Sequence, residues 1–347
     1  MTGPSDAPLI LAVNPGSTTS QYGLFRGAVC LGESDRPTEG SVEAVVAGGR
    51  RVVADLGHRT ADLAAVIARG GLLRAVAGGV YEINDALVRD CLEHRYGRHA
   101  ANLGPPAARM LAEQACARAF IADPPTTDEL CDEARLTGLP EIGRRSIFHA
   151  LNHKAVAAAL AADLGTTCAA AHLVVVHMGG GLSVGAHLRG RVVDVNDALE
   201  GDGPFALNRS GGLPALAFVR WAQGKPADEV TRAVCKTGGL LAHLGTQDGR
   251  EIERRVQGGD ARATAVFEAF AYNIAKAVAA LAVPLEGRVD GIGLTGGLAR
   301  WQGLVDRLRE RLAWLAPVHA YPGTREIPAL AAAALSVLTG ERRARAY

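Results

Sequence analysis

The chain has 347 residues, of which 48% are hydrophobic and 21% charged, with 37 basic against 36 acidic side chains. This length gives room for two ordinary domains, and the composition is too apolar for a disordered chain. The balance of charge argues against a protein that wraps nucleic acid or adheres to a membrane surface. We therefore expect a folded globular protein with neither of those partners.

The six cysteines are scattered, with no Cys-x-x-Cys pair and no histidine at metal-ligand spacing. They are predicted to be reduced thiols that pack in the interior, without disulfides or zinc. Residues 1–8 contain neither the basic patch nor the apolar run of a secretory signal, so a cytoplasmic location is expected. The longest stretch without Asp, Glu, Lys or Arg, Leu164–Leu188, contains histidines and glycines and indicates strand and turn rather than a membrane span.

Hydrophobic patterning along the chain predicts strands that alternate with helices. Apolar, β-branched runs bounded by glycine predict strands at Leu9–Val13, Val52–Leu56, Leu173–His177, Arg191–Val195 and Val289–Leu294. Periodic runs rich in Ala, Leu and Arg predict helices at Ala61–Arg69, Pro105–Ala119, Lys154–Leu164, Ala261–Leu281 and Gln302–Leu315. This alternation is typical of an α/β protein.

Two segments, 11–27 and 174–190, align without a gap at an offset of 163 residues. Each has an apolar strand that ends in a polar residue (Asn14 or His177), a turn, a second strand, and an Arg-Gly turn into a third strand. Identical residues are few, so chance similarity of two glycine-turned hairpins remains an alternative. The shared pattern predicts two halves, with the boundary near 152–164 and a helix returning at the C-terminus.

The two hairpin turns are rich in small and hydroxyl-bearing residues, running Asn14-Pro-Gly-Ser-Thr-Thr19 and Gly179-Gly-Gly181. Consecutive glycines cost backbone entropy and are favoured where another group approaches the chain closely. Backbone N–H groups and hydroxyls in such turns bind anions. We therefore predict that a polyphosphate is held between the two halves, although the first turn also fits an ordinary hairpin.

A G-x-G-x-x-G pattern occurs at Gly291–Gly296, but its first glycines lie inside a predicted strand and no lone acidic residue follows in a second strand. We therefore discount a dinucleotide-binding fingerprint. What remains is a strand, then Thr295-Gly296-Gly297, then a helix that begins near Leu298 and exposes backbone donors at its N-terminus. The chain contains no Walker A sequence.

Five further polar residues stand beside turn or helix-start signals: Arg69, Asp123, His149, Arg209 and Glu326. Each taken alone has a simple structural explanation. Arg69, for example, fits a cation in the last turn of a helix before the glycines at 70 and 71. Considered in chain order with the two turns, the five residues match a known pattern.

From Leu9 to about Leu338 the chain resembles the acetate and butyrate kinase family, with the closer match to its butyrate kinase branch. The resemblance is carried by residues 13–19, 69–73, 78–84, 146–152, 176–187, 191–199, 203–211 and 321–323. It implies an α/β, two-domain actin-like (ASKHA, ribonuclease H-like) fold with duplicated βββαβαβα cores and a central cleft. The domains would be 1–152, joined by a C-terminal helix at about 323–347, and a nucleotide-binding domain at 153–322.

The same resemblance implies a reversible, direct in-line transfer of the ATP γ-phosphoryl group to a short-chain fatty acid, giving acyl phosphate and ADP. Butyrate or a branched C4–C5 acid would be the acceptor, Mg²⁺ the metal, and a homo-oligomer, dimer or higher, the assembly. The matching positions imply catalytic roles for Arg69, Asp123, His149 and Arg209. They imply nucleotide binding by Asn14, Ser17, Thr19, His177, Gly179, Gly180, Gly181, Thr295, Gly296 and Gly297, and metal binding by Asn14 and Glu326.

The chemistry fits these residue types. A carboxylic acid with a pKa near 4 is already an anion at pH 7, so no general base is required. The difficulty is repulsion between two anions, which arginines, an imidazole and Mg²⁺ reduce. Phe148 with the glycines at 70 and 71 is expected to form an apolar wall that leaves room for a longer acyl chain.

Two departures from the family are visible: Gln21 stands where a lysine is usual, and Thr324-Arg325 is less acidic than usual. Two other functions remain open. One is a hydroxyl-directed (sugar) kinase of the same fold, for which Asp123 is the candidate base. The other is a non-catalytic ATP-binding clamp. Trapping an acyl phosphate with hydroxylamine would separate the carboxylate kinase from both.

Overall fold

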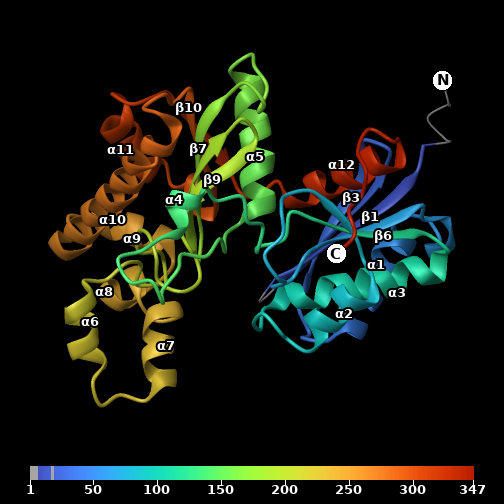
Figure 1. Ribbon diagram of the computed structural model, residues 1–347, viewed down its shortest axis with the longest axis horizontal. Coiled ribbons are helices and arrows are strands. Elements are labelled where there is room, and N and C mark those ends of the chain that lie inside the picture. The colour runs from blue at the N-terminus through green and yellow to red at the C-terminus, as the bar shows by residue number, and fades with distance from the viewer. Residues whose placement is uncertain (1–6, 17–18) are drawn as a thin grey trace. The chain divides into compact units, whose positions relative to one another are not determined.

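The computed structural model describes residues 7–16 and 19–347 and divides the chain into two compact units (Figure 1). Unit 1 comprises the chain up to Asp128 together with Arg325–Tyr347, and unit 2 comprises Glu129–Thr324. The boundary therefore differs from the predicted one, because residues 129–152 lie in unit 2. The return of the C-terminal segment to the first unit agrees with the expected start near residue 323.

Unit 1 is built on a six-stranded sheet in the order β3-β2-β1-β4-β6-β5. Its strands are β1 (Leu9–Pro15), β2 (Thr19–Arg26), β3 (Val29–Pro37), β4 (Ala65–Arg69), β5 (Val80–Glu82) and β6 (Arg118–Ala122). Its helices are α1 (Val42–Asp55), α2 (Asp85–Leu92), α3 (Gly104–Ala115) and α12 (Glu326–Leu338), with 3₁₀ turns η1 (Thr60–Asp62) and η2 (Ala100–Leu103). All seven residues of β1 are buried, as expected for a central strand covered on both faces.

Unit 2 is built on a five-stranded sheet in the order β11-β10-β7-β8-β9. Its strands are β7 (His172–Met178), β8 (Leu182–Leu188), β9 (Arg191–Val195), β10 (Gly291–Gly296) and β11 (Val318–Pro322). Its helices are α4 (Asp132–Arg135), α5 (Ala150–Asp163), α6 (Ala215–Ala222), α7 (Ala227–Cys235), α8 (Gly239–Leu244), α9 (Gly249–Gln257), α10 (Ala261–Ala280) and α11 (Gln302–Leu312). Short 3₁₀ turns are η3 (Val283–Leu285) and η4 (Gly297–Arg300).

The predicted duplication is confirmed at the level of architecture. β1 pairs antiparallel with β2 and parallel with β4, and β7 pairs antiparallel with β8 and parallel with β10. The third strand of each meander, β3 or β9, pairs antiparallel with the second, with a register shift in both copies. Apart from β5 at one edge of the first sheet, the two sheets thus share one strand order, and they place Asn14 and His177 at corresponding positions.

Two predicted elements are wrong, because burial in the folded protein determined their type. Val52–Leu56, predicted as a strand, is the end of α1, where Val52 and Val53 continue a buried helical stripe from Val45 and Val46. Ala61–Arg69, predicted as a helix, is a 3₁₀ turn followed by β4, whose Ala65–Ala68 run is fully buried and therefore lacks alternation. The helix predicted at Pro105–Ala119 stops at Ala115, and β6 follows.

The G-x-G-x-x-G segment forms β10, and its glycines serve packing. A Cβ on Gly291 would lie 2.9 Å from Leu164 Cδ1, and one on Gly293 would lie 3.0 Å from Val156 Cγ1. Val156 belongs to helix α5 and Leu164 is its C-terminal cap. The glycines therefore allow α5 to lie close to the sheet. The segment is therefore a packed strand and not a dinucleotide-binding loop, as predicted.

Within the described residues, one stretch, Ala261–Leu285, is long and apolar enough to pass as a membrane span by length and hydropathy. It contains α10, whose Phe267, Phe270, Ile274 and Val278 are buried in the unit 2 core. This packing is that of a central helix in a globular domain. The apolar length is thus explained by the core that α10 fills.

Candidate active site

Asn14 lies near the end of β1 and is 4% exposed. Its side-chain amide nitrogen donates to Glu326 Oε2 at 2.7 Å and to Gln21 Oε1 at 3.2 Å. Asn14 Oδ1 and Glu326 Oε1 are both buried and accept no hydrogen bond from the protein. Because a buried oxygen without a partner is costly, these two atoms are suited to a ligand that supplies positive charge or donors.

Arg69 joins this group from the neighbouring strand. It is the last residue of β4, which runs parallel to β1, so both strands end at the same edge of the sheet. Its Nη1 lies 3.7 Å from Glu326 Oε1, and both side chains are largely buried. Glu326 begins α12, as predicted. The structure therefore brings Asn14, Arg69 and Glu326 together, although Arg69 ends a strand and not the predicted helix.

The residue types in this cluster fit Mg²⁺. Amide and carboxylate oxygens are hard ligands, and Mg²⁺ in phosphoryl-transfer sites commonly takes only one or two protein ligands besides phosphates and water. Asn14 Oδ1 and Glu326 Oε1 are the two oxygens left without hydrogen bonds. Within the described chain no group of three or more His, Cys, Asp or Glu side chains is placed to hold a metal alone. Metal binding here would thus require the phosphates.

The first predicted phosphate turn is described only in part, because Ser17 lies outside the described residues. Thr19 begins β2, and its carbonyl accepts a hydrogen bond from the Gly16 amide at 3.0 Å. Thr38 Oγ1 donates to the Gly16 carbonyl at 2.8 Å and lies 2.9 Å from Ser20 Oγ. Thr38 therefore braces this turn from the neighbouring chain segment.

Asp123 directly follows β6 and has a φ of 38°. Its carboxylate accepts a hydrogen bond from the Gly79 amide at 2.8 Å, and its own amide donates to the Gly79 carbonyl at 3.0 Å. These contacts tie the end of β6 to the segment that precedes β5. They give Asp123 a turn-stabilising task, and a catalytic role for it stays a prediction.

The room for a longer acyl chain that was expected beside the glycines at 70 and 71 is taken up by protein atoms, and the acyl wall itself stays a prediction. A Cβ on Gly70 would lie 2.6 Å from Pro124 Cβ, and one on Gly71 would lie 2.7 Å from Asn102 Oδ1. Phe148 is 3% exposed, and its ring packs edge-on against the ring of His153 at 5.1 Å. These glycines permit close packing and do not leave an open chamber.

In unit 2, His149 and His177 lie side by side. His149 immediately precedes α5, and His177 lies in β7. Their rings are parallel within 5°, with centroids 3.7 Å apart. His149 Nδ1 lies 3.0 Å from Ser183 Oγ, and Asn152 Nδ2 donates to His177 Nδ1 at 2.9 Å. The structure therefore pairs two imidazoles that the sequence placed 28 residues apart.

Behind this pair lie two more imidazoles that sequence reasoning missed. Ser183 Oγ is 2.8 Å from His153 Nε2, and His153 Nδ1 is 3.4 Å from His187 Nε2. Burial lowers the pKa of His153 to about 3 and the pKa of His187 well below its ordinary value, so both are neutral at pH 7. The available signal was the spacing: His149 and His153 are four apart at one helix start, and His177 and His187 lie on paired strands.

The Gly179–Gly181 turn lies between β7 and β8, and the Gly179 amide donates to the Gly181 carbonyl at 3.0 Å. A Cβ on Gly179 would lie 3.3 Å from His177 Nε2, so that nitrogen lies beside the turn. A Cβ on Gly180 would meet no atom within 4 Å. Gly180 therefore offers the open backbone that the approach of a phosphate requires.

Arg209 packs against the same turn. Its guanidinium donates to the Ala198 carbonyl, and a Cβ on Gly181 would overlap it. Burial lowers the pKa of Arg209 from its ordinary value, but an arginine remains charged at neutral pH. Its Nε is buried and has no hydrogen-bond acceptor in the protein. Arg209 thus brings a partly buried positive charge to the glycine turn, as an anion site requires.

Within Thr295–Gly297, the first two residues are buried against the protein and the third is exposed. Thr295 is fully buried; its hydroxyl donates to the Gly323 carbonyl at 2.9 Å and accepts from Asn152 Nδ2 at 3.2 Å. Gly296 has a φ of 90°, and a Cβ there would overlap the main chain of Met178. A Cβ on Gly297 would meet nothing within 4 Å. Gly297, which begins η4, is therefore the member of this segment that is open to a ligand.

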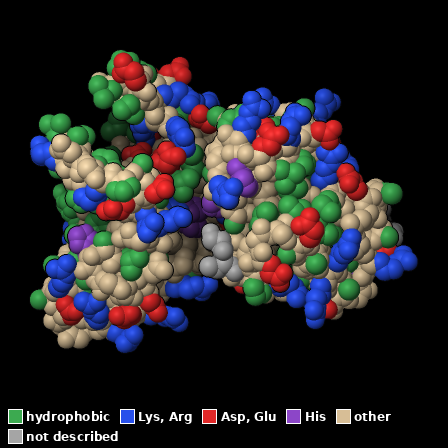
Figure 2. All heavy atoms as spheres, turned by 90° about the horizontal axis from the view of Figure 1, so that it is seen from below, with side chains coloured by type: hydrophobic (Ala, Val, Ile, Leu, Met, Phe, Trp, Pro, Cys, Tyr) green, Lys and Arg blue, Asp and Glu red, His purple; other side chains and the backbone are tan. Residues whose placement is uncertain are grey.

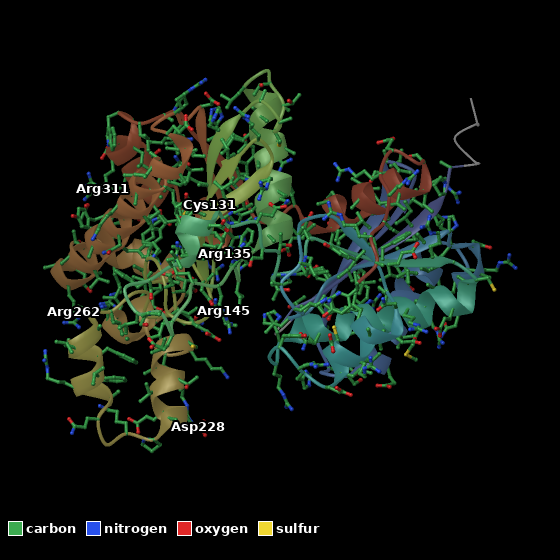
Figure 3. All side chains as sticks on the ribbon, in the orientation of Figure 1. Cys131, Arg135, Arg145, Asp228, Arg262 and Arg311 are labelled. Atoms are coloured by element: carbon green, nitrogen blue, oxygen red, sulfur yellow. The ribbon has the colours of Figure 1, made fainter. Side chains whose placement is uncertain are left out.

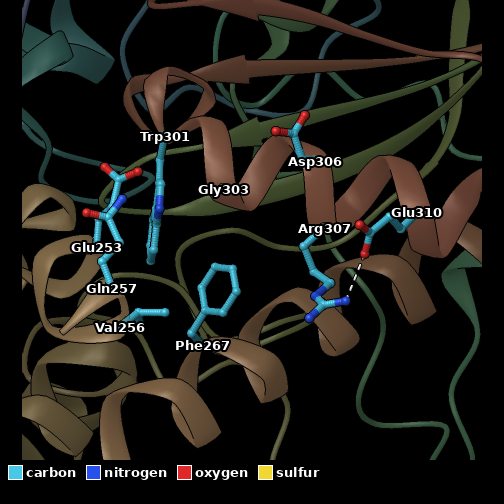
Figure 4. A pocket seen from close by; sticks show the side chains of 9 residues that line it. All are labelled: Glu253, Val256, Gln257, Phe267, Trp301, Gly303, Asp306, Arg307 and Glu310. Atoms are coloured by element: carbon cyan, nitrogen blue, oxygen red, sulfur yellow. Dashed lines mark hydrogen bonds and ion pairs between the residues drawn. The ribbon is translucent and has the colours of Figure 1, made fainter. Parts of the chain in front are cut away.

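A hollow of about 210 Å³ lies elsewhere in unit 2, between α9, α10 and α11 (Figure 4). It is lined by Glu253, Val256, Gln257, Phe267, Trp301, Gly303, Asp306, Arg307 and Glu310. Arg307 is engaged there by Glu310 at 2.8 Å and by Glu268 at 2.6 Å. None of the described site candidates lines this hollow.

The molecular surface agrees with the composition. On the face seen in Figure 2, basic and acidic side chains of the described residues are interspersed.

All six cysteines are free thiols, and Cys131, labelled in Figure 3, immediately precedes α4. The expectation that all six pack in the interior is wrong for Cys30 and Cys116, which are exposed.

Comparisons with known proteins place this geometry in a family. The Acetokinase family profile matches residues 139–329. A probable butyrate kinase of Coprothermobacter proteolyticus is 42% identical over 97% of this chain and 99% of that protein. A probable butyrate kinase of Enterococcus faecalis is 40% identical over 97% of each.

Solved structures support the fold. An acetate kinase of Porphyromonas gingivalis superposes with a TM-score of 0.77 at 20% identity, covering 96% of this chain and 100% of that one. A propionate kinase of Francisella tularensis gives 0.75 at 20% identity, covering 94% and 98%. The predicted actin-like α/β fold is confirmed. The chain therefore belongs to the acetokinase family and is an ATP-dependent kinase whose phosphoryl acceptor is a carboxylate.

Proposed function

We propose that the protein is a butyrate kinase, which reversibly transfers the γ-phosphoryl group of ATP to butyrate or a branched C4–C5 acid. The observation that carries this substrate is the 42% identity, over 97% of the chain, to a protein named probable butyrate kinase. In the forward direction a carboxylate oxygen forms a bond to the γ-phosphorus as the bond to the β-phosphate oxygen breaks. Acyl phosphate and ADP are the products.

The chain's own residues supply what this transfer needs. A carboxylate is already ionised at pH 7, so the work is positioning two anions and stabilising charge on the equatorial oxygens. We assign this stabilisation to Arg69, His149 and Arg209. The partial burial of Arg69 and the buried, unpaired Nε of Arg209 support the assignment, because charges act more strongly away from water.

We assign Mg²⁺ to Asn14 and Glu326 on the basis of their two buried oxygens without hydrogen bonds. When bound, the metal neutralises charge on the β- and γ-phosphates. Arg69 pairs with the Glu326 carboxylate and holds it in place, which orients the oxygen that would face the metal. This ion pair also compensates the cost of burying a carboxylate when no metal is present.

We assign the nucleotide to Asn14, Ser17, Thr19, His177, the 179–181 turn and Gly297. The absence of any atom near a Cβ on Gly180 or Gly297 supports the approach of a ligand at both points. Thr295 and Gly296 contribute by holding the chain around Gly297, since both are buried within the protein. Asp123 is retained as a proposed catalytic residue on the family match alone.

The test is acyl-phosphate formation from ATP, Mg²⁺ and a panel of C2 to C6 carboxylates, trapped with hydroxylamine. We expect the highest kcat/KM at C4 and C5, with overlap between straight and branched acids, because one methylene is worth only about 1–3 kcal/mol. A strict preference for acetate would contradict butyrate. ATP binding without acyl phosphate from any acid would favour the non-catalytic clamp, and phosphorylation of a sugar instead would favour the hydroxyl-directed kinase.

We further propose a cytoplasmic homo-oligomer, dimer or higher. The six free thiols support a reducing compartment. Helix α6 buries none of its residues and exposes Leu216, Val219 and Trp221, which supports a contact with a second copy of the chain. Sedimentation over a hundredfold range of concentration tests this assembly, and a monomer throughout that range would contradict it.

A further inference from the structure

The orientation of one buried amide can be deduced from its neighbours. Asn152 is fully buried near the start of α5, and its Nδ2 lies 3.2 Å from Thr295 Oγ1 and 2.9 Å from His177 Nδ1. The Thr295 hydroxyl has a single proton, which it donates to the Gly323 carbonyl at 2.9 Å. Thr295 Oγ1 is therefore an acceptor for Asn152, so the NH₂ end of the amide must face it.

The same NH₂ group fixes the tautomer of His177. Because it donates to His177 Nδ1, that nitrogen must be an acceptor, and the neutral ring carries its proton on Nε2. A Cβ on Gly179 would lie 3.3 Å from His177 Nε2. The protonated nitrogen of His177 thus lies beside the glycine turn assigned to phosphate.

His149 is held in a parallel way. Its Nδ1 lies 3.0 Å from the Oγ of Ser183, a residue with no exposed surface. Ser183 Oγ lies 2.8 Å from His153 Nε2, and His153 Nδ1 lies 3.4 Å from His187 Nε2. A row of hydrogen-bonding groups therefore backs His149 from the interior, just as Asn152 and Thr295 back His177.

A stacked pair of this kind favours neutral rings. The His149 and His177 centroids are only 3.7 Å apart, so two imidazolium charges would repel each other strongly. The fully buried His153 also disfavours charge behind the pair. Two neutral rings that each donate from Nε2 satisfy both conditions and still offer donors to a phosphate.

We propose that Asn152 and Ser183 are positioning residues for the transfer: each fills Nδ1 of one stacked ring and so keeps His177 and His149 as neutral Nε2–H donors toward the phosphoryl groups. For His149 this means that His187 Nε2–H donates to His153 Nδ1, His153 Nε2–H donates to Ser183 Oγ, and the Ser183 hydroxyl donates to His149 Nδ1. The catalytic part of this assignment rests on the proposed function. The His177 tautomer follows from geometry within unit 2, and the direction of the Ser183 row is part of the proposal.

The direct test is ¹⁵N NMR of the full-length, histidine-labelled protein, with His149→Asn and His177→Asn used to assign the signals. We expect both rings to be neutral with the proton on Nε2. In Asn152→Asp, which has the same shape but a carboxylate that only accepts, His177 should become Nδ1–H or doubly protonated. A wild-type His149 or His177 with its proton on Nδ1, or a His177 signal unchanged in Asn152→Asp, would overturn the assignment.

The kinetic test separates positioning from folding. Ser183→Ala and Asn152→Asp should each lower kcat for acyl-phosphate formation by about 10–100-fold, as is common when a partner that orients a catalytic histidine is lost. KM for ATP should change by less than about threefold, and Ser183→Thr, which keeps the hydroxyl, should restore kcat. Ser336→Ala is the matched control, because Ser336 is also a buried serine but donates only within α12.

Wild-type kcat in a folded Ser183→Ala protein would overturn the role of Ser183, and wild-type kcat in folded Asn152→Asp would overturn that of Asn152. If Ser183→Ala does not fold, two other results still test the role of Ser183. An Nδ1–H tautomer of His149 in the wild type, or a low kcat in folded Ser183→Thr, would overturn it. The two failures are distinguishable: wild-type protein that makes no acyl phosphate contradicts the proposed function, whereas an Nδ1–H tautomer contradicts the positioning set whatever the activity.

Discussion

The ends of β1 and β7 occupy corresponding positions in the two units but carry opposite chemistry. Asn14 lies among an arginine and a glutamate, with two buried oxygens left without hydrogen bonds. His177 lies among neutral imidazoles, an amide and hydroxyls. Both strands have the same neighbours in the sheet, so the duplication preserved the backbone and left the side chains free to diverge.

This difference indicates that the two strand ends bind ligands of opposite charge. The cluster at β1 has oxygen atoms to offer a cation, and the array at β7 has nitrogen donors to offer an anion. A magnesium nucleotide presents both kinds of charge. Substitutions in the two regions should therefore fail in different ways, and the size of each failure tests the comparison.

The largest effect is expected for Arg209→Ala, which removes a positive charge from the glycine turn. Activity should fall by about 10³–10⁵-fold while the protein folds, because an arginine that stabilises the transition state of phosphoryl transfer is worth that much. The measurement is kcat/KM in the hydroxylamine assay, with circular dichroism to check folding. Arg262→Ala, at an exposed arginine of α10 labelled in Figure 3, is the matched control. An Arg209 variant within tenfold of wild type would remove this residue from the site.

Next in size is Glu326→Gln, which keeps the shape of the β1 cluster but removes its negative charge. The Mg²⁺ concentration for half-maximal activity should rise by about 10–100-fold, in line with the loss of a metal ligand or its orienting partner. Exposed Glu310→Gln serves as the control. An unchanged Mg²⁺ dependence would place the metal elsewhere and undo the contrast between the two strand ends.

The two neighbouring glycines of the second turn give a sharper comparison. Gly181→Ala should lower the free energy of unfolding by about 1 kcal/mol, because the Arg209 guanidinium must move off the Ala198 carbonyl to make room for the added methyl group. Gly180→Ala should leave stability within about 0.5 kcal/mol of wild type, since its methyl group meets no protein atom, but should raise KM for ATP. Urea unfolding and ATP titration measure both effects. Equal stability losses in the two variants, or an unchanged KM in Gly180→Ala, would contradict the assignment of this turn to phosphate.

A last comparison concerns the acid sensitivity of the array at β7. The pKa of His153 is about 3 and that of His187 lies well below its ordinary value, both because of burial. As the pH falls below about 6.5, the unfolded chain binds protons that these folded rings refuse, down to about pH 3 for His153, so stability present at pH 7 is lost. Each histidine should contribute about 1.4 kcal/mol per pH unit.

Urea unfolding at pH 7, 6 and 5 measures this slope, and His187→Gln should make it shallower by the share of one histidine. An identical slope in His187→Gln would show that His187 does not resist protonation in the folded protein.

The sequence predicted the duplicated strands and a C-terminal helix, which begins at Glu326. The roles of the individual site residues stay predictions, although the structure brings Asn14, Arg69 and Glu326 together and stacks His149 on His177. Those features depend on local patterns: alternating apolar runs, turn residues and motif order. It failed at Ala61–Arg69, because an Ala-rich strand buried on both faces carries no alternation. It also misjudged the glycines at 70 and 71, since only the fold shows that Pro124 and Asn102 occupy the space beside them.

Asn152, Ser183 and His187 were not predicted for a related reason. Each is unremarkable within its own segment and acquires a task only through partners that are 25 to 143 residues away or on a paired strand. Spacing along one helix or strand shows which residues share a face. It does not show which atom of a neighbouring ring an amide or hydroxyl will reach.

The glycines of β10 have an effect beyond packing. They set how deeply α5 sits, and α5 and its preceding residue carry His149, Asn152 and His153. A methyl group at Gly293 would lie 3.0 Å from Val156 Cγ1, so Val156 and the helix that carries it would have to shift by a few tenths of an ångström. The glycines that resemble a dinucleotide-binding fingerprint therefore help to position the histidines. A substitution at one of them can change kcat while every residue that contacts the reactants stays the same.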